Sequence, residues 1–239
     1  MAIYDDGRFK IVTEDSLSNI QIFKSLSLPT RRCIAQNAVA VEYLAGVDLY
    51  RQSDPPTGLF ALQAGRVKLY RQSKKKCQIL ALPMPGDCFG AESLPTGAPS
   101  PYSATTLMPV VIVHLRHDCL QHLLDEHTDF RDVFLQLIID RLKQFVTLVH
   151  DLAFRDVTSR LATVLSLRAE VEGLPHHEGI IYDRLLSQQE FADMVGTARE
   201  VVYRTFKKFE ADGLVQMTRS SILVYDLDTL RAIALQEAH

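Results

Sequence analysis

Two predicted helices joined at a glycine constrain the fold of this chain more than any other feature. Ser187-Gln-Gln-Glu190 has the S-x-x-E form of a capping box, which opens a helix. Gly196 ends that helix, and Thr197-Ala-Arg-Glu200 is a second box of the T-x-x-E form. The second helix is therefore expected to begin at Thr197 and to end at Asp212-Gly213. Two capped helices with a glycine between them are typical of a helix-turn-helix.

A pair of short predicted strands follows directly, at Leu214–Met217 and Ile222–Tyr225. Thr218-Arg-Ser-Ser221 joins them, so they are expected to form the hairpin that is the wing of a winged helix. On the N-terminal side, the sequence predicts a helix at Val157–Glu172 and a strand at Ile180–Tyr182. Between these two elements, His176-His177-Glu178 is interpreted as a solvated turn rather than a metal site. Residues 156–239 are therefore predicted to form one winged helix-turn-helix domain.

The second helix of the motif separates into a polar and an apolar face. At about 100° per residue, Arg199, Glu200 and Arg204 fall within one arc, and Val202 and Phe206 lie opposite. Arginine can form a bidentate pair with guanine, and glutamate can accept a hydrogen bond from cytosine. Base contacts come from residues near the N-terminus of a recognition helix. The sequence therefore predicts Arg199, Glu200 and Arg204 as base-reading residues of a protein that binds double-stranded DNA.

Two interpretations of this face stay open. Glu200 has a structural alternative, because it could serve only to complete its capping box. Lys207 and Lys208 are expected to contact DNA phosphates, but exposed lysines are common, and the pair could form only a solvated face. The net charge of -3 weakens the prediction of DNA binding slightly, yet a local basic face can still bind phosphate.

The N-terminal half has the period of β-strands. Residues 18–37 predict a short helical segment, and residues 38–115 alternate short apolar runs with Gly- and Pro-containing turns. The runs are VAVEYL, GLFALQAG, RVKLYR, CQILAL and VVIVHL. Several short strands at this spacing predict an antiparallel sandwich or barrel. The fold class is therefore α+β.

A long helix is predicted at residues 129–153. One apolar stripe follows a 4-3-4-3-4 spacing, which is an a/d heptad seam. Such a stripe packs either on the sheet of its own chain or across a two-fold axis, and we favour the seam of a homodimer. Arg141 interrupts the stripe, as a polar residue that fixes register often does. The predicted interface comprises Phe134, Ile138, Arg141, Phe145, Leu148 and Leu152.

Several classes of protein are disfavoured by the sequence. The N-terminus lacks the pattern of a signal peptide, and no apolar run is long enough to span a bilayer, so a cytoplasmic protein is expected. The four cysteines have no metal-ligand spacing and are expected to be unpaired. The spacings of the cluster His114, His117, Cys119, His122 and His127 match no established ligand set, and no histidine precedes His114. We therefore expect no metal, no cofactor and no enzymatic activity; a metal-binding jelly-roll enzyme is the least favoured alternative.

Segments in both halves of the chain carry a family resemblance. They are LAFRDVTSRLATVL, LSQQEFADMVGTAREVVYRTFKKFEADGLV and ILVYDLDTL in the C-terminal half, and IQIFKSLSLPTRRC with GLFALQAGRVKLYRQSKKKCQILALPMPGDCFGAESL in the N-terminal half. The chain resembles the Crp/Fnr family of bacterial transcription regulators over nearly its whole length. The resemblance implies a jelly-roll β-roll resembling a cyclic nucleotide-binding domain (1–128), a dimerisation helix with a hinge (129–155) and the winged helix-turn-helix (156–239).

The resemblance also implies partners and a DNA target. Family members are expected to bind DNA as homodimers and to contact RNA polymerase. The R-E-x-x-x-R pattern of the cyclic-AMP receptor branch is present as Arg199, Glu200 and Arg204, which implies a palindromic, TGTGA-like site. Thr158 and Gln189 match positions that contact phosphates. The expected phosphate contacts are Thr158, Gln189, Thr197, Lys207, Lys208 and Arg219.

The sequence departs from the family pattern at the effector site. The glutamate of the G-E-L element stands one place late, as Glu92, and Tyr102-Ser103 replaces the arginine–serine pair that holds a cyclic phosphate. Phe145-Val146 replaces the residues that bind adenine. An anionic phosphate without its arginine is poorly compensated. We therefore expect an effector other than cyclic AMP, or no effector. The predicted pocket for an effector comprises Gly90, Glu92, Ser93, Tyr102, Ser103, Arg141 and Phe145.

Overall fold

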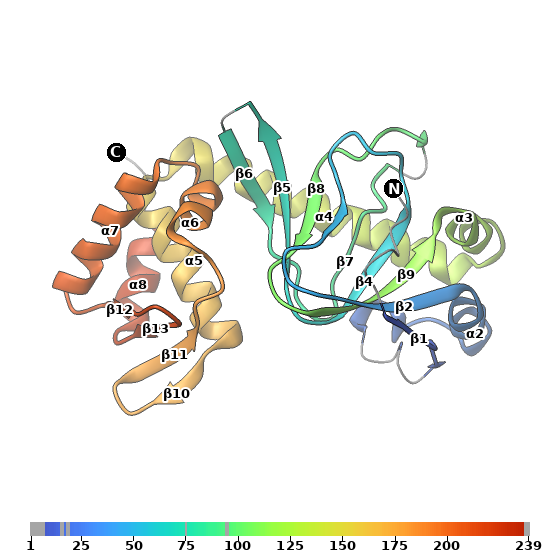
Figure 1. Cartoon of the computed structure of the whole chain (residues 1–239), viewed down its shortest axis with the longest axis horizontal. Helices are drawn as coiled ribbons and strands as arrows, with labels where there is room; N and C mark the ends of the chain where they lie inside the picture. The colour runs from blue at the N-terminus through green and yellow to red at the C-terminus, as the bar shows by residue number, and fades with distance from the viewer. Residues whose placement is uncertain (1–7, 15–16, 18–19, 75, 94–95, 237–239) are drawn as a thin grey trace. The chain divides into compact units, whose positions relative to one another are not determined.

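The computed structural model describes residues 8–14, 17, 20–74, 76–93 and 96–236 of the 239-residue chain (Figure 1). The chain divides into two compact units, Met1–Gln144 and Phe145–His239. The division falls inside one long helix, within the segment 129–155 that was predicted to join the domains. None of the helices that the structure describes is long and apolar enough to cross a membrane.

Two antiparallel sheets form most of the N-terminal unit. The first has the order β1-β2-β9-β4-β7, with β1 Arg8–Lys10, β2 Ala38–Tyr43, β9 Val110–Arg116, β4 Gly58–Ala64 and β7 Cys88–Phe89. The second has the order β3-β8-β5-β6, with β3 Asp48–Tyr50, β8 Ser103–Thr106, β5 Val67–Ser73 and β6 Lys76–Ala81. The expected strands are present as β2, β4, β5, β6 and β9. The short strands β1, β3, β7 and β8 were not predicted.

Helices cover one end of the first sheet. Helix α2 (Leu28–Asn37) contacts β2 and β9, and α3 (His117–Glu126) contacts β4 and β9 (Figure 1). The short 3-10 helix η1 (Gln21–Phe23) adds Phe23 to the same core. Their apolar sides share one core with the sheet, in which Ile34, Leu115 and Leu120 are fully or almost fully buried. This core stabilises the roll because each Å² of apolar surface removed from water contributes about 25 cal/mol to the free energy of folding.

The long helix α4 (Thr128–Phe154) presents two different apolar stripes. Phe134 and Leu137 are buried in the core of the N-terminal unit, Ile138 packs against it, and Arg141 is buried as well. Leu135, Leu142 and Val146 are each about 60% exposed (59%, 61% and 61%). The structure thus corrects the predicted dimer seam at Phe134, Ile138 and Arg141: these residues pack on their own chain, which was the alternative considered for the stripe.

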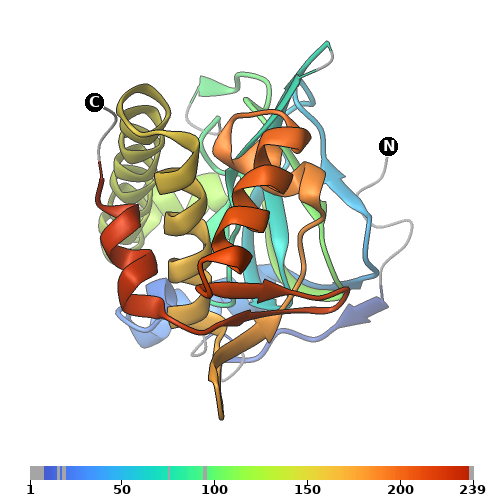
Figure 2. The same ribbon diagram turned by 90° about the vertical axis from the view of Figure 1, so that its left-hand side faces the viewer.

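The C-terminal unit combines the end of α4 and the helices α5 to α8 with a four-stranded antiparallel sheet (Figure 2). The sheet order is β10-β11-β13-β12. The elements are α5 Val157–Glu172, β10 Leu174–His176, β11 Gly179–Asp183, α6 Gln188–Val195, α7 Arg199–Ala211, β12 Val215–Met217, β13 Ser221–Val224 and α8 Leu227–Ala234. The bounds of α5 match the sequence prediction, and each wing strand lies within one residue of its predicted bounds. Strand β10 and helix α8 were not predicted.

Candidate nucleic-acid interface

The turn between α6 and α7 is built as the sequence predicted. Ser187 Oγ accepts a hydrogen bond from the Glu190 amide at 3.2 Å, and Glu190 Oε2 accepts one from the Ser187 amide at 3.0 Å. This reciprocal capping box confirms the predicted start of α6. Gly196 follows α6 with φ of 69° and ψ of 43°, a left-handed conformation that L side chains resist. The turn therefore depends on glycine at this position.

The prediction of a second capping box at Thr197–Glu200 is wrong. The N-cap of α7 is Ala198, which has no side-chain cap, and the helix begins at Arg199 rather than Thr197. The physical reason is that Thr197 still belongs to the turn, because its amide donates to the Ala192 carbonyl oxygen at 3.0 Å. Glu200 is consequently not engaged in capping. Of its two interpretations, the structural one loses its support.

Helix α7 leaves the three predicted base-reading residues free. Arg199, Glu200 and Arg204 are exposed, and none of their side chains has a hydrogen bond or ion pair to any residue that the structure describes. The opposite face is buried, and Phe206 packs edge-on against Phe191 of α6 with ring centroids 5.3 Å apart. Burial of one face fixes the rotation of the helix, so the polar face points to solvent as three unpaired side chains.

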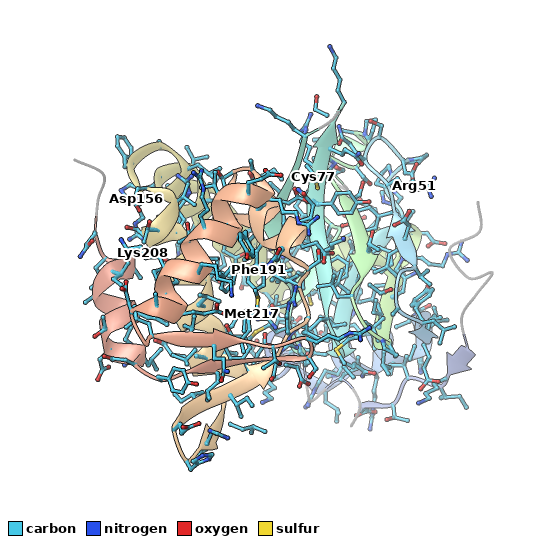
Figure 3. The ribbon with its side chains drawn as sticks, turned by 60° about the vertical axis from the view of Figure 1, so that its left-hand side comes forward. Arg51, Cys77, Asp156, Phe191, Lys208 and Met217 are labelled. Carbon is cyan, nitrogen blue, oxygen red and sulfur yellow. The ribbon has the colours of Figure 1, made fainter. Side chains whose placement is uncertain are left out.

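The predicted phosphate contacts differ in their freedom to bind. Lys207 Nζ lies 2.7 Å from Glu210 Oε2, and this hydrogen bond raises the pKa of the lysine. Gln189 donates to Asp193 Oδ1 at 2.8 Å. Lys208 is exposed at the surface (Figure 3), and Arg219 is exposed in the turn of the wing. Lys208 and Arg219 are the two basic side chains of the set that need not leave an ion pair to reach a phosphate.

Thr158 and Thr197 are half-buried. Thr158 is the second residue of α5. The N-cap of this helix is Asp156, whose carboxylate accepts a hydrogen bond from the Ser159 amide at 2.7 Å. Thr197 lies in the turn that precedes α7. Both threonines are thus near helix N-termini, where amide groups and the helix dipole favour an anion.

The C-terminal unit is acidic in spite of this basic face. Residues 145–239 contain 10 Lys and Arg and 14 Asp and Glu. Several of the acidic groups are committed to the fold: Asp156 and Asp226 cap helices, and Glu172 pairs with the buried Arg168 at 2.9 Å. The positive charge at the polar face is therefore local and not a property of the unit.

A second set of predicted residues meets inside the β-roll. The Tyr102 hydroxyl donates to Glu92 Oε1 at 2.5 Å, and Arg141 Nε lies 3.6 Å from the same oxygen. Arg141 also donates to the Cys88 carbonyl oxygen at 3.0 Å and to Gln144 Oε1 at 2.8 Å. The structure thus brings together Glu92, Tyr102 and Arg141 as predicted, while the parts played by Cys88 and Gln144 were missed.

Aromatic rings surround this polar cluster. Tyr102 lies 6.0 Å from Tyr50 between ring centroids, and Phe60 stacks on Phe89 at 5.5 Å. Burial and the nearby Glu92 raise the pKa of Tyr102 well above its usual range, so this tyrosine remains a neutral hydrogen-bond donor. Tyr50, Phe60 and Phe89 were not predicted, because nothing in the alternating pattern of a strand tells which aromatic residues meet.

Each of the other four predicted pocket residues has contacts or a place in the fold of its own. Gly90 has φ of +89°, and a Cβ there would lie 2.8 Å from Phe60 Cδ2, so the glycine lets the chain pass close to the ring. Ser93 donates to the Pro99 carbonyl oxygen at 3.2 Å, and Ser103 accepts from the Gln52 amide at 2.9 Å. Both serine hydroxyls are thus engaged in hydrogen bonds with backbone groups. Phe145 belongs to the C-terminal unit, and its part in a pocket remains a prediction.

Known proteins share both parts of this arrangement. Residues 40–127 match the cyclic nucleotide-binding domain, and residues 159–233 match the Crp-like helix-turn-helix domain. A global nitrogen regulator of Synechocystis sp. is 30% identical over 181 residues, which cover 74% of this chain and 80% of that protein. The chain belongs to the Crp/Fnr family.

Other Crp/Fnr proteins extend the match to nearly the whole chain. The CRP-like cAMP-activated global transcriptional regulator of Mycobacterium tuberculosis is 25% identical over 218 residues, or 91% of this chain and 97% of that protein. A solved structure of a CooA variant from Carboxydothermus hydrogenoformans has the same fold, with a TM-score of 0.71 and 23% identity over 90% of this chain and 95% of that one.

Membership of the Crp/Fnr family indicates the general activity of the protein. Crp/Fnr proteins are DNA-binding transcription regulators that function as dimers. One relative is named as cAMP-activated and another as a global nitrogen regulator, so membership alone does not identify an effector.

Proposed function

We propose that this Crp/Fnr protein is a homodimeric regulator that binds a palindromic, TGTGA-like site through Arg199, Glu200 and Arg204. The observation that carries the proposal is the state of these three side chains, which are exposed and unpaired on the solvent face of α7. Unpaired arginines can each form a bidentate pair with the O6 and N7 atoms of guanine. Glu200, released from capping, can accept a hydrogen bond from the N4 amino group of cytosine.

Phosphate contacts place the helix in the groove. Lys208 and Arg219 supply mobile positive charge, while Thr158, Gln189 and Thr197 supply hydrogen-bonding groups near helix N-termini. Lys207 joins them only after it leaves Glu210. RNA polymerase is the further protein partner that we expect for a regulator of this family.

The exposed stripe of α4 supports the proposed dimer. Leu135, Ile139, Leu142, Val146 and Val149 are spaced 4-3-4-3 and are between 38% and 65% exposed. Heptad spacing of this kind is the seam of a two-stranded coiled coil. The seam is shifted by one residue from the predicted one, because the neighbouring stripe is used for packing on the roll. A two-fold axis at this seam would match the two-fold symmetry of a palindromic site.

We further propose that DNA binding does not require cyclic AMP. Tyr102 and Arg141 already hold Glu92 inside the roll, and the aromatic rings of Tyr50, Phe60 and Phe89 pack around them. A nucleotide there would have to displace a buried, charge-assisted hydrogen bond. This observation favours an effector-independent regulator or one whose effector is smaller and less polar than a cyclic nucleotide.

Fluorescence anisotropy with a labelled TGTGA-N6-TCACA duplex tests the proposal. We expect saturable binding of two chains per duplex, with the same affinity in the absence and presence of saturating cyclic AMP. The matched control is a duplex of identical composition with scrambled half-sites. Equal affinity for the two duplexes would show that the protein does not read this sequence, and a large increase with cyclic AMP would overturn the effector proposal alone.

A further inference from the structure

The hairpin β10–β11 ends in three adjacent residues with metal-binding side chains. The strands pair from Leu174 opposite Ile181 to His176 opposite Gly179, so His177 and Glu178 form the turn. His176 is half-buried, and the other two residues are exposed. The sequence alone favoured a solvated turn here, because the composition of the segment is that of an exposed loop.

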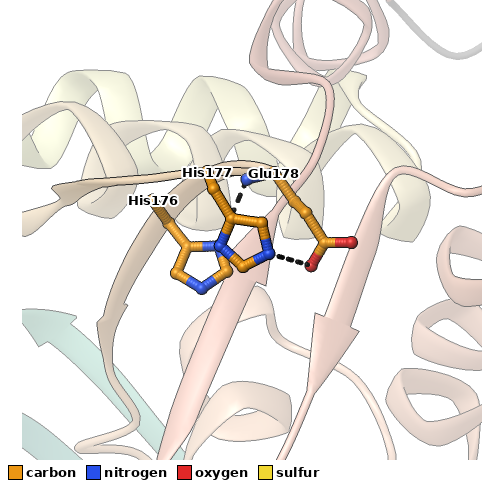
Figure 4. A group of neighbouring side chains, drawn as sticks. All are labelled: His176, His177 and Glu178. Carbon is orange, nitrogen blue, oxygen red and sulfur yellow. Dashed lines mark hydrogen bonds and ion pairs between the residues drawn. The ribbon is translucent and has the colours of Figure 1, made fainter.

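The structure turns the three side chains toward one another (Figure 4). One potential ligand atom from each of His176, His177 and Glu178 lies within 4.8 Å of the other two. His177 Nε2 is 3.6 Å from Glu178 Oε2, and His176 Nδ1 accepts a hydrogen bond from the Glu178 amide at 3.3 Å. The two imidazole rings have centroids 4.1 Å apart. The turn has therefore already gathered two nitrogen atoms and one carboxylate oxygen on one side.

We propose that this turn binds a divalent transition metal ion, with Zn²⁺ as the reference ion. Zinc takes histidine nitrogen and carboxylate oxygen at about 2.0–2.2 Å, which sets neighbouring ligand atoms roughly 3.4 Å apart. Because His177 and Glu178 are exposed, their side chains can reach this spacing around His176 by rotation about χ angles, without movement of the strands. The metal takes the place of the Glu178 amide at His176 Nδ1 and of the direct contact between His177 and Glu178.

The ligand set determines the class of site. Two histidines and one glutamate leave at least one coordination position open, which is the pattern of an exchangeable site rather than a closed structural one. Imidazole and carboxylate together favour Zn²⁺, Ni²⁺ and Cu²⁺ over Mg²⁺ and Ca²⁺. The open position is filled by water or by a ligand atom of another molecule.

Calorimetric titration of the full-length protein with Zn²⁺ tests this site, and the protein must carry no histidine tag. We expect one ion per chain at this site, and an affinity about tenfold or more weaker for His177→Ala and for the double variant His176→Ala/His177→Ala. His117→Ala is the matched control, since it removes an exposed histidine from the other unit and is expected to bind as the wild type does.

The cysteines require a second readout, because thiolates also bind zinc. Titration with Co²⁺ gives d–d absorption bands for nitrogen and oxygen ligands, and a thiolate-to-metal charge-transfer band for cysteine. We expect the first without the second, and the loss of the d–d bands in the double variant. The proposal is overturned if the wild type binds no metal, if the double variant binds as the wild type does, or if the charge-transfer band accounts for all of the bound ion.

Discussion

Helix α7 carries exposed polar side chains that no described residue engages, and Arg199, Glu200 and Arg204 are three of them. Replacing Arg204 with Ala is expected to weaken binding to the palindromic duplex by about 1–3 kcal/mol, and to reduce the preference for guanine at one position of each half-site. Anisotropy titrations against duplexes with single base changes measure both effects.

Lys208→Ala is the control for this loss. As a phosphate contact, Lys208 should weaken binding to every duplex about equally and lower the salt dependence of the affinity. An Arg204→Ala variant that weakened all duplexes by the same factor would show that Arg204 contacts the backbone and not a base.

A buried histidine makes the stability of the N-terminal unit depend on pH. His114 stacks on Phe60 with ring centroids 4.4 Å apart, and burial lowers its pKa to about 4. Between the unfolded value of about 6.5 and pH 4, the unfolded chain therefore binds the extra proton. This contribution to stability is complete above about pH 6.5 and is lost as the pH falls toward 4, up to about 3 kcal/mol.

Urea unfolding of wild type and His114→Gln across this range measures the effect. The difference between their free energies of unfolding should change with pH in the stated direction. A difference that stayed constant from pH 7 to pH 4 would mean that His114 titrates alike in both states. His117→Gln, at the exposed start of α3, should leave the pH dependence as in the wild type.

At the residue scale, the sequence predicted a capping interaction correctly where all the residues that decide it lie within the four-residue pattern. Ser187 and Glu190 form the box that their spacing predicts. Thr197 and Glu200 have the same spacing and form none, because the left-handed Gly196 needs one more turn residue before a helix can start. A pattern of four residues cannot show that the first of them is already committed to the preceding turn.

Helix α4 is the element whose surface the sequence predicted least well. It is apolar on two sides, and two registers of the same heptad, one residue apart, both fit the sequence. The choice between them depends on which side meets the roll. That information lies in β-strands far away along the chain and not in the helix itself.

The exposed register leads to a prediction about the oligomeric state. Leu142→Glu places a charge in the centre of the proposed seam, and we expect it to convert the dimer to a monomer because a buried unpaired charge is costly. Light scattering after size-exclusion chromatography measures the mass. Lys143→Glu adds the same side chain one position along, at a residue whose side chain is 70% exposed, and should remain dimeric. A dimeric Leu142→Glu variant would place the interface elsewhere.

The first helix of the DNA-binding motif depends on its cap. Ser187→Ala removes the acceptor for the Glu190 amide and should lower the stability of the C-terminal unit by about 1 kcal/mol. Chemical denaturation followed by far-ultraviolet circular dichroism gives this value. Ser220→Ala, in the exposed turn of the wing, serves as the comparison and should change stability by less than about 0.5 kcal/mol. Equal losses in the two variants would contradict a special role for the cap.

At the scale of the whole molecule, a dimer that reads two half-sites must match their separation. Two recognition helices related by a two-fold axis contact half-sites about one helical turn apart, or about 10 base pairs. Inserting about five base pairs turns one half-site to the opposite side of the duplex. We expect the affinity to fall to that of a duplex with one half-site, as measured by anisotropy. Unchanged affinity would show that the two chains bind independently.

The family and the general order of the fold were accessible from the sequence, and the effector site was not. The helix-turn-helix rests on contacts between neighbours in the chain, as Phe191 and Phe206 show. The polar cluster of the roll joins Cys88, Glu92, Tyr102 and Arg141 from a strand, two loops and a helix. Only the folded chain shows that these groups satisfy one another.

The excess of acidic over basic residues in the C-terminal unit affects how the protein finds its site. A strongly basic protein is held by any stretch of duplex and slides along it. This unit attracts DNA only over the short range at which Arg199, Arg204 and Lys208 act, and repels it farther away. Encounters with unrelated sequence should therefore be brief, and the search should proceed by repeated collisions from solution, with little of the protein sequestered on the rest of the chromosome.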